Sequence, residues 1–386
     1  TDASGLDVIQ FSNDGLSYAQ WMPYERFHSW TLTPGDGAKI VYAHVTDVPG
    51  NIQTITDTIL LDTTAPTAAV TPLANFVDST TFAVSWSGDD SGAGIANFDV
   101  QVREGTGGVW IDWLTETTET TLVFTGSHGQ TYYFRVRARD ALGNLGAYAD
   151  GDGDTATTVD LLPPVGSVQI DADAPYAGNR DVTLALSATD LSGVAAFQVS
   201  NDGQVFTDWI DYASTHPWMV TAVDGQKVVS VRYKDQLGHV STVYTDTIIL
   251  DTTPPIGTVV IENGDGPITI TIVTLALTAV DTNSSVSQMQ FSNDGSSWSI
   301  WEPYAETKIW SLGNENGWRT VYGRYRDLIG NQATFSDTVL LDNTAPVVAV
   351  ETLTPYQSSL DFTVTWGGTD THTEIDSFDI QVKVGE

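Results

Sequence analysis

The chain has 386 residues, with 49 Asp and Glu against 15 Lys and Arg, a formal charge of −34, and no Cys. At roughly 100–200 residues per domain this length fits about two to four domains, and the charge disfavours nucleic acid and anionic membrane surfaces as partners. The lack of Cys excludes a disulfide framework, thiol catalysis and Cys-based zinc sites.

The composition predicts a folded, turn-rich chain with little helix. Of the 49 acids, 38 are Asp and 11 are Glu, and Asp favours turns and metal-binding loops where Glu favours helices. A hydrophobic content of 41% excludes disorder. No stretch approaches the roughly 18 apolar residues of a membrane span, so we expect no membrane insertion in this segment, and any export signal would lie outside it.

Internal repeats dominate the sequence. The segment Phe-Ser-Asn-Asp-Gly at 11–15 returns at 291–295, and at 199–203 with Val in the first place. A Trp follows each copy, at Trp21, Trp209 and Trp301, and a second Trp follows at Trp30, Trp218 and Trp310. Each unit ends in Asp-Thr-Thr-Ala-Pro or a close variant, at 62–66, 251–255 and 342–346. We call these units type I.

A second kind of unit, type F, alternates with the first. Its segments at 81–86 and 98–102, which contain Trp86 and Phe98, recur at 361–366 and 378–382. The order along the chain is therefore I, F, I, I, F, and a three-unit block repeats at an offset of 280 residues between Phe98 and Phe378.

These repeats predict five domains. The boundaries fall at 1–64, 65–162, 163–253, 254–344 and 345–386. Alignment of the units implies that the first domain lacks its N-terminal strands and that the last is truncated. The chain is then a window of a longer one, or its half-domains are completed by neighbouring chains.

Within each unit the pattern is that of antiparallel strands. The run from Tyr132 to Arg139 alternates apolar and polar residues, and Asn-Asp-Gly favours a tight hairpin. Strands about ten residues apart with no helical period predict all-β, seven-stranded sandwiches. A Pro after each closing Asp-Thr-Thr stiffens the linker, so we expect a rod of tandem sandwiches.

Both unit types resemble known repeats of large prokaryotic surface proteins. Type F is similar to fibronectin type III domains, with Trp86 in the place of their core Trp and Tyr132 in the place of their corner Tyr. Type I resembles bacterial immunoglobulin-like repeats through its Phe-Ser-Asn-Asp-Gly and Asp-Thr-Thr-Pro-Pro segments. The resemblance covers nearly the whole chain and implies an extracellular or cell-surface location, but not one function.

Nothing in the sequence indicates catalysis. It contains no nucleophile elbow, no zinc-protease motif and no phosphate-binding glycine loop, so we expect no enzyme activity. The repeated Trp21, Trp209, Trp301 and Trp113 are interpreted as core residues rather than as a sugar-binding platform. Trp318 replaces Ala38 of the first unit and is predicted to be an exposed contact.

The Asp residues predict a cation site at each junction between domains. In this topology the linker lies beside the loops at the start of the next sandwich, so a linker Asp should meet one Asp from each of two loops. Converging carboxylates favour Ca²⁺, which accepts six to eight oxygens. The predicted ligands are Asp62, Asp89, Asp90 and Asp140; Asp160, Asp190 and Asp235; Asp251, Asp281 and Asp327; and Asp342 and Asp370.

Other readings of the acidity stay open. The same Asp residues can cap turns locally, as at Asp140 in the run Asp-Ala-Leu-Gly-Asn. The alternating acids of the loop 150–154 suggest weak cation binding, and halophilic adaptation is a further account of the charge.

The sequence thus predicts part of a long exported structural protein that forms an extracellular filament, sheath or S-layer, with junctions rigidified by Ca²⁺. Copies of itself in a polymeric assembly are the expected partner, and surface glycans are a further candidate. The alternatives are an adhesin stalk that holds a distal binding domain, and a spacer array in a secreted hydrolase.

Overall fold

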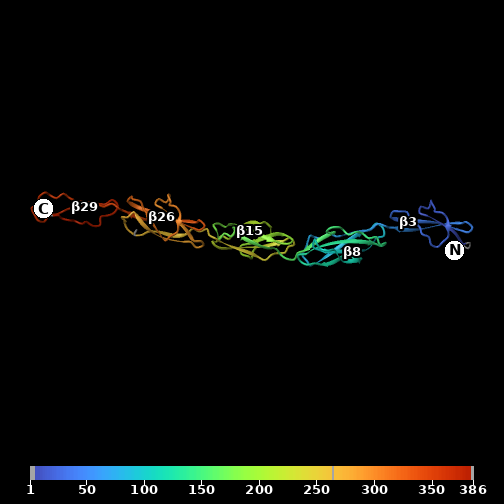
Figure 1. Ribbon diagram of the computed structural model, residues 1–386. Coiled ribbons are helices and arrows are strands. Elements are labelled where there is room, and N and C mark those ends of the chain that lie inside the picture. Colours follow the sequence, from blue (N-terminus) through green and yellow to red (C-terminus); the bar gives the residue numbers. More distant parts are fainter. Residues whose placement is uncertain (1–4, 263–264, 384–386) are drawn as a thin grey trace. The chain divides into compact units, whose positions relative to one another are not determined.

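The computed structural model describes residues 5–262 and 265–383, and all regular structure among them is β (Figure 1). The predicted all-β class is therefore confirmed. No helix in the described part of the chain is long and apolar enough to cross a membrane. Each sheet takes its strands from one of the five predicted ranges. The outermost residues of the first and fifth ranges, 1–4 and 384–386, lie outside the described residues.

The described residues of the first repeat form one four-stranded sheet in the order β2-β1-β3-β4. Its buried core is small and consists of Ile9, Ala43 and Val45. The strands are β1 Leu6–Ser12, β2 Met22–Pro23, β3 Gly37–Asp47 and β4 Ile52–Leu61.

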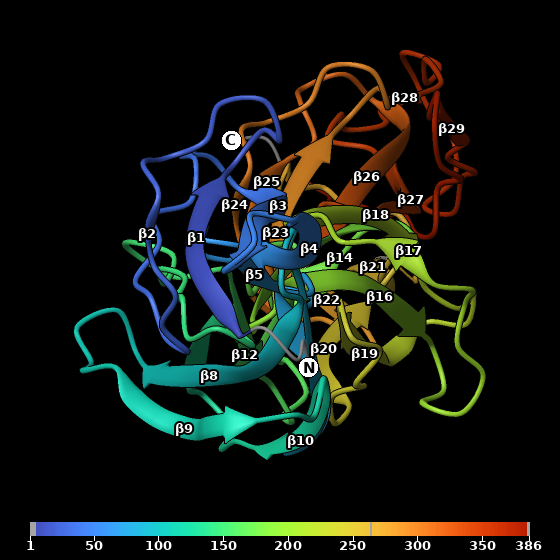
Figure 2. The same cartoon turned by 90° about the vertical axis from the view of Figure 1, so that its right-hand side faces the viewer.

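The 65–162 repeat is a sandwich of a three-stranded sheet, β10-β7-β5, and a five-stranded sheet, β6-β12-β11-β8-β9. Strands β8 and β9 run side by side in Figure 2, in agreement with their antiparallel pairing. Its strands are β5 Thr67–Val70, β6 Phe76–Val77, β7 Thr81–Asp89, β8 Ile95–Glu104, β9 Ile111–Thr117, β10 Thr121–Thr125, β11 Thr131–Asp140 and β12 Thr155–Val159.

Aromatic residues from both sheets fill the core of this repeat. Trp86 of β7 is only 2% exposed and packs in one cluster with Phe134 and Val136 of β11, because alternate residues of each strand face the partner sheet. Tyr132 is buried, and its hydroxyl accepts a hydrogen bond from the amide of Ser127 at 3.0 Å. The core positions expected for Trp86 and Tyr132 are confirmed.

The 163–253 repeat has the sheets β13-β15-β18 and β14-β20-β19-β16-β17. Two segments, Ala188–Ala195 and Tyr233–Ser241, each a loop with the strand ends beside it, belong to the same compact unit as the residues up to Val165. The strands are β13 Val165–Ile170, β14 Tyr176–Ala177, β15 Asp181–Thr189, β16 Val194–Ser200, β17 Ile210–Asp211, β18 Thr215–Met219, β19 Gly225–Asp235 and β20 Tyr244–Leu250.

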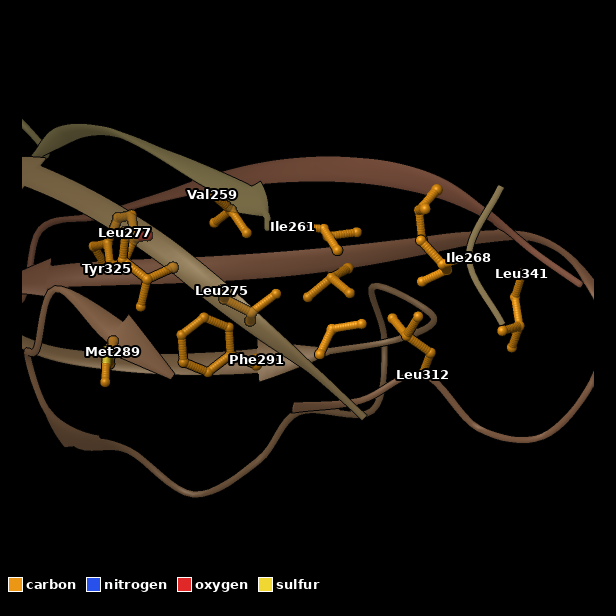
Figure 3. Close-up of a cluster of buried hydrophobic side chains, with 13 residues drawn as sticks. Val259, Ile261, Ile268, Leu275, Leu277, Met289, Phe291, Leu312, Tyr325 and Leu341 are labelled. Carbon is orange, nitrogen blue, oxygen red and sulfur yellow. The ribbon is translucent and has the colours of Figure 1, made fainter. Parts of the chain in front are cut away.

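The 254–344 repeat has the sheets β21-β22-β25 and β24-β23-β26-β27. Figure 3 shows side chains of both sheets pointing toward one another, among them Leu275 of β22, Phe291 of β23 and Tyr325 of β26, each fully buried. The strands are β21 Ile256–Ile261, β22 Ile272–Val280, β23 Val286–Ser292, β24 Glu302–Pro303, β25 Thr307–Ser311, β26 Gly317–Asp327 and β27 Gln332–Leu341.

In the 345–386 range, the regular structure among the described residues is one antiparallel pair, β28 Val347–Val350 and β29 Trp366–Thr369.

The Asn-Asp-Gly hairpin ties the two sheets of a type I repeat together. In the last type I repeat Asn293 accepts a hydrogen bond from the Trp310 indole at 2.6 Å and donates one to the Ser311 carbonyl at 2.9 Å. The same pair of bonds links Asn201 to Trp218 and Met219. The second Trp of each unit is thus a structural anchor, which explains why it recurs with the hairpin.

The first Trp of the type I units lies elsewhere than the sequence predicted. Trp301 is half-buried beneath the Arg326 guanidinium, 4.3 Å from the ring centre, and Trp209 lies similarly near Arg232. Trp21 is 42% exposed. Only the type F residue, Trp113, packs against a hydrophobic core as expected. The core interpretation is therefore wrong for the type I units, since recurrence does not distinguish the two faces of a sheet.

Candidate metal sites

Four groups of ionisable side chains each bring three possible ligand atoms within 4.8 Å of one another. Every group combines a linker Asp with a residue from the loop after the second long strand of the next repeat. In the first three groups the third member is the Asp that ends strand β11, β19 or β26. The groups are Asp62, Asp90 and Asp140; Asp160, Asp190 and Asp235; Asp251, Asp281 and Asp327; and Asp342, Asp370 and His372.

The structure thus gathers eleven of the twelve residues proposed from the sequence, and it leaves one apart. Asp89 is exposed at the end of β7, where it pairs with Thr67 of β5, and it belongs to none of the four groups. Asp90 follows directly, and its carboxylate accepts hydrogen bonds from the Gly92 and Gly94 amides. Asp89 is still paired in the strand ladder while Asp90 begins the loop that turns toward the linker, so only Asp90 joins Asp62.

The fourth group contains a residue that the sequence analysis missed. His372 stands two residues after Asp370, and its Nδ1 is hydrogen-bonded with the Thr371 hydroxyl at 2.9 Å. The spacing of one carboxylate and one imidazole in a short loop is a signal that was available in the sequence. An imidazole suits transition metals, so this donor set differs from the all-oxygen sets of the other three groups.

Each strand-ending Asp shapes its own turn. Asp327 Oδ1 accepts the amides of Ile329, Gly330 and Asn331, and the Asn331 side chain donates to Oδ2. The arrangement around Asp140 and Asn144 is the same in kind. Turn capping is therefore present, as the sequence predicted.

The turn also holds the linker. The Asn331 side chain donates a second hydrogen bond to the main-chain carbonyl of Asp251 at 3.1 Å, and Asn144 does so to Asp62 at 3.2 Å. One Asn therefore fixes both the turn and the backbone of the linker residue whose carboxylate enters the group.

The linker carboxylates receive donors from the neighbouring loop. Asp62 Oδ2 accepts the Ala93 amide at 2.6 Å, and a Cβ at Gly92 would collide with the same carboxylate, so Gly92 permits this close approach. Asp251 Oδ2 accepts the Ser284 hydroxyl at 2.5 Å. These bonds orient the carboxylates toward their partners before any cation binds.

Burial and like charge act together in two of the groups. Burial raises the pKa of Asp190, and the carboxylates of Asp160 and Asp235 add to that rise. Burial and the carboxylates of Asp281 and Asp327 likewise raise the pKa of Asp251. Ionised carboxylates at this spacing are unfavourable unless a positive charge compensates them.

Hydrogen bonds dominate at two other positions. Burial opposes the shift at Asp140, but the bonds donated by Asn144 and neighbouring amides lower the pKa of that carboxyl. The Thr373 hydroxyl lowers the pKa of Asp342. The pKa of one carboxyl is therefore raised in each of the second and third groups and lowered in each of the first and fourth.

The acidic loop 150–154 is used for structure. Asp154 Oδ2 accepts the amides of Val70 in β5 and Val136 in β11, which belong to different sheets of the sandwich. Asp152 pairs with Arg103 at 2.5 Å. In the two following repeats, Asp246 accepts a hydrogen bond from the Ile170 amide and Asp337 accepts one from the Ile261 amide, again between the two sheets. The Asp154 carboxylate is therefore explained by an inter-sheet bond that recurs from repeat to repeat.

No protein-family model matches the chain. Chitinase A1 of Niallia circulans is 27% identical over 192 residues, which are 47% of this chain and 25% of the chitinase, so the match spans about a quarter of that relative.

Two solved structures give weaker similarity. The fibronectin(III)-like modules of Clostridium thermocellum CbhA share 16% identity at a TM-score of 0.28, covering 45% of this chain and 92% of theirs. A tetra-tandem repeat from the extending region of a large adhesion protein shares 16% identity at a TM-score of 0.30, covering 88% and 92%. The two-sheet sandwiches of the 65–162, 163–253 and 254–344 repeats have the all-β fold of tandem immunoglobulin-like and fibronectin type III-like repeats, as the sequence predicted.

Proposed function

We propose that the chain is a structural repeat region of a long exported protein on a prokaryotic surface, with Ca²⁺ bound at the junctions between repeats. The repeats themselves are non-catalytic in this proposal. They act as an extended support, either within a filament, sheath or S-layer made of many copies or as a stalk that carries a distal adhesive domain.

One observation carries the proposal: the same triad of acidic residues recurs at successive linkers. Asp62, Asp160 and Asp251 each come from a linker and each meet two carboxylates of the following loops. Hydrogen bonds from the next loop hold each linker carboxylate, but they do not offset the like charge of three carboxylates whose oxygens lie within 4.8 Å of one another. A hard cation would offset it, because Ca²⁺ binds several carboxylate oxygens in flexible geometry.

Ca²⁺ at these positions would restrict bending between repeats. The ion would bind a linker residue and two loops at once, so any rotation of the linker would break coordination bonds. The energy of binding to the folded state adds to stability as the free ion concentration rises above its dissociation constant.

The experiment is titration of the metal-free chain with Ca²⁺ by calorimetry, followed by X-ray scattering and thermal unfolding with Ca²⁺ or chelator. We expect about three tight sites from the all-carboxylate groups, a higher melting temperature and narrower interdomain motion with Ca²⁺. Mg²⁺ should substitute poorly, because it demands a smaller octahedral shell. Unchanged stability and scattering after chelation would refute the junction role.

A spacer array of a secreted hydrolase is a second candidate, favoured by the 27% identity to a chitinase over 192 residues. The full reading frame decides between the two, since a hydrolase domain in the same polypeptide would support the spacer. Electron microscopy of native material gives the complementary test. Ordered filaments or sheets whose axial period matches the 280-residue block would support the structural assembly.

A further inference from the structure

The outer face of the 254–344 repeat contains no acidic residue on its three long strands. Alternate residues of β26 from Trp318 to Arg326, and of β27 from Gln332 to Leu340, point away from the core. Those of β23 from Gln288 to Ser292 lie beside them. None is Asp or Glu, in a chain that has 49 of them. At about 3.3 Å per residue the stretch from 318 to 326 is roughly 26 Å long.

Two arginines on this outer face have no carboxylate partner among the described residues. Arg324 stacks on Trp298 at 3.9 Å and donates to the Thr334 hydroxyl at 3.1 Å. Arg326 stacks on Trp301 at 4.3 Å and donates to the Gln288 side chain. A guanidinium has five N–H donors, so both keep donors for an incoming anion while the rings hold them in place.

The other type I repeats share one feature of this face, a cation or imidazole over an aromatic ring, but they lack a Trp at the position of Trp318. Arg232 stacks on Phe206 in the place of Arg324, and His44 stacks on Tyr18, so a cation or imidazole over an aromatic ring is common to the type I fold. Trp318 is different.

Strand register places Trp318 at the position of Ala38 in the first repeat, which pairs with Leu60 as Trp318 pairs with Leu340. The matching residue of the third repeat is Gln226, opposite Ile249. Because Trp318 is 72% exposed, it does not pack in the core, and the fold does not require a Trp at this position.

We propose that the outer face of the 254–344 repeat binds a linear glycan that carries uronate carboxylates. The Trp318 ring provides a flat apolar surface for the C–H face of one sugar, in line along β26 with the two guanidinium groups. Arg324 and Arg326 pair with uronate carboxylates, the anion that a planar guanidinium binds in bidentate geometry. The face is complementary in charge to such a polymer although the chain as a whole is acidic.

The net charge does not prevent this binding. At physiological ionic strength charges beyond about 8 Å are screened, so the outward rows of β23, β26 and β27, which contain no Asp or Glu, present local positive charge. The acids beside these rows are Asp294, whose carboxylate accepts the Ser292 hydroxyl, and Glu302 of β24, which is paired with Lys308. Screening applies equally to a second copy of the chain, which is therefore the competing occupant that the test below distinguishes.

The test is calorimetric titration of the 386-residue chain with oligogalacturonate in the presence of chelator. Cello-oligosaccharide and chito-oligosaccharide serve as neutral controls. We expect binding of the acidic oligomer alone, and about a tenfold loss of affinity for Trp318→Gln, which installs the residue of the third repeat. Arg326→Thr, the residue of the first repeat, should weaken binding and reduce its salt dependence.

Ile309 provides a matched control. It is also 72% exposed, but it lies on β25 in the other sheet of the same repeat, so Ile309→Gln should leave affinity unchanged. Thermal unfolding of each variant checks that the fold is intact. Absence of binding, equal binding of neutral oligomers, or equal affinities for Trp318→Gln and Ile309→Gln would overturn the proposal. A concentration-dependent dimer abolished by Trp318→Gln would assign the face to a second copy instead.

Discussion

At the scale of single residues, the role of a side chain depends on its individual buried contacts, and Asp154 shows why composition could not reveal them. Its sequence context, alternating Asp and Gly, is typical of a cation loop, yet its carboxylate binds the amides of Val70 and Val136. The sequence shows that Asp154 is acidic but not that two amides from different sheets converge on it. Long-range contacts of this kind depend on the folded topology, which no local motif records.

Replacing Asp154 with Ala should destabilise the 65–162 repeat by about 1–3 kcal/mol, because two backbone N–H groups lose their acceptor. Urea unfolding measures the loss. Asp150→Ala in the same loop is the control and should fall within about 0.5 kcal/mol of the parent chain, since that residue is exposed. Equal effects of the two substitutions would show that Asp154 does not link the sheets.

His216 gives the stability a pH dependence. It packs edge-on against Phe197 with ring centres 5.2 Å apart, and burial lowers its pKa below the ordinary value of 6.5. The folded state therefore disfavours the charged imidazole, while the unfolded chain takes up the proton near pH 6.5. Stability from this residue should be present above that pH, fall as the pH drops through it, and level off below the lowered pKa.

The pH experiment compares the parent chain with His216→Phe by urea unfolding between pH 8 and pH 5. Carboxylates titrate in both proteins, so the difference between the two curves isolates the imidazole. The variant should gain stability relative to the parent as the pH falls. Parallel curves would contradict the assignment.

At the scale of elements, the periodic patterns predicted the strands better than they predicted the direction of single side chains. Alternation from Tyr132 to Arg139 correctly gave β11. The Asn-Asp-Gly runs do mark turns after β1, β16 and β23, but the paired strands begin only at Met22, Ile210 and Glu302, so these connections are longer than the tight hairpin predicted.

The sequence did not show which face of the sheet a recurring side chain points to. Trp301 recurs at a fixed position, as a core residue would, but it lies beneath the Arg326 guanidinium outside the core. Stacking of a cation on the ring also requires an aromatic residue at one fixed position, so recurrence alone does not indicate a core residue.

One turn stores backbone strain that no pattern indicated. Asp171, Ala172 and Asp173 follow β13 with consecutive positive φ values of 45°, 56° and 63°. Asp tolerates the left-handed region better than Ala does, and a left-handed residue with a Cβ costs about 1–2 kcal/mol. Two hydrogen bonds between Asp171 and Thr183 hold the turn in this shape.

Ala172→Gly should therefore stabilise the chain by up to about 1 kcal/mol, since glycine adopts positive φ without the steric cost. Ala174, two residues on in the same connection, has no positive φ and is the control. Gly at that position should be neutral or destabilising, because it only adds freedom to the unfolded chain. Calorimetric melting of both variants checks the prediction, which fails if the two changes act alike.

At the scale of the whole molecule, the order of repeats and the grouping of Asp residues followed from sequence alignment alone. Asp62, Asp160 and Asp251 occupy equivalent places before a Pro-bearing linker, and each meets carboxylates of the next repeat. What alignment missed was chemical detail at the ligand level. It did not separate Asp90 from Asp89, and it overlooked His372, which has no acidic counterpart in the other groups.

Asp251 distinguishes a specific site from general acidity. Its raised pKa means that the ionised carboxylate opposes folding near neutral pH when no cation is present. Asp251→Asn removes that charge but keeps an oxygen to accept the Ser284 bond. The variant should therefore melt at the same or a higher temperature than the parent in chelator. With Ca²⁺ the order should reverse, because the variant lacks the stabilisation by bound Ca²⁺, which is about 2.7 kcal/mol when free Ca²⁺ is a hundredfold above its dissociation constant.

Asp208→Asn makes the same change of charge at an exposed position outside the four groups. It should shift melting equally with chelator and with Ca²⁺, because a distant surface charge contributes only to net repulsion. Adaptation to high salt predicts that both variants behave alike and that NaCl replaces Ca²⁺ at matched ionic strength. A reversal of order confined to Asp251→Asn requires an ion held by that carboxylate, since screening acts on both positions and cannot change the sign at one of them.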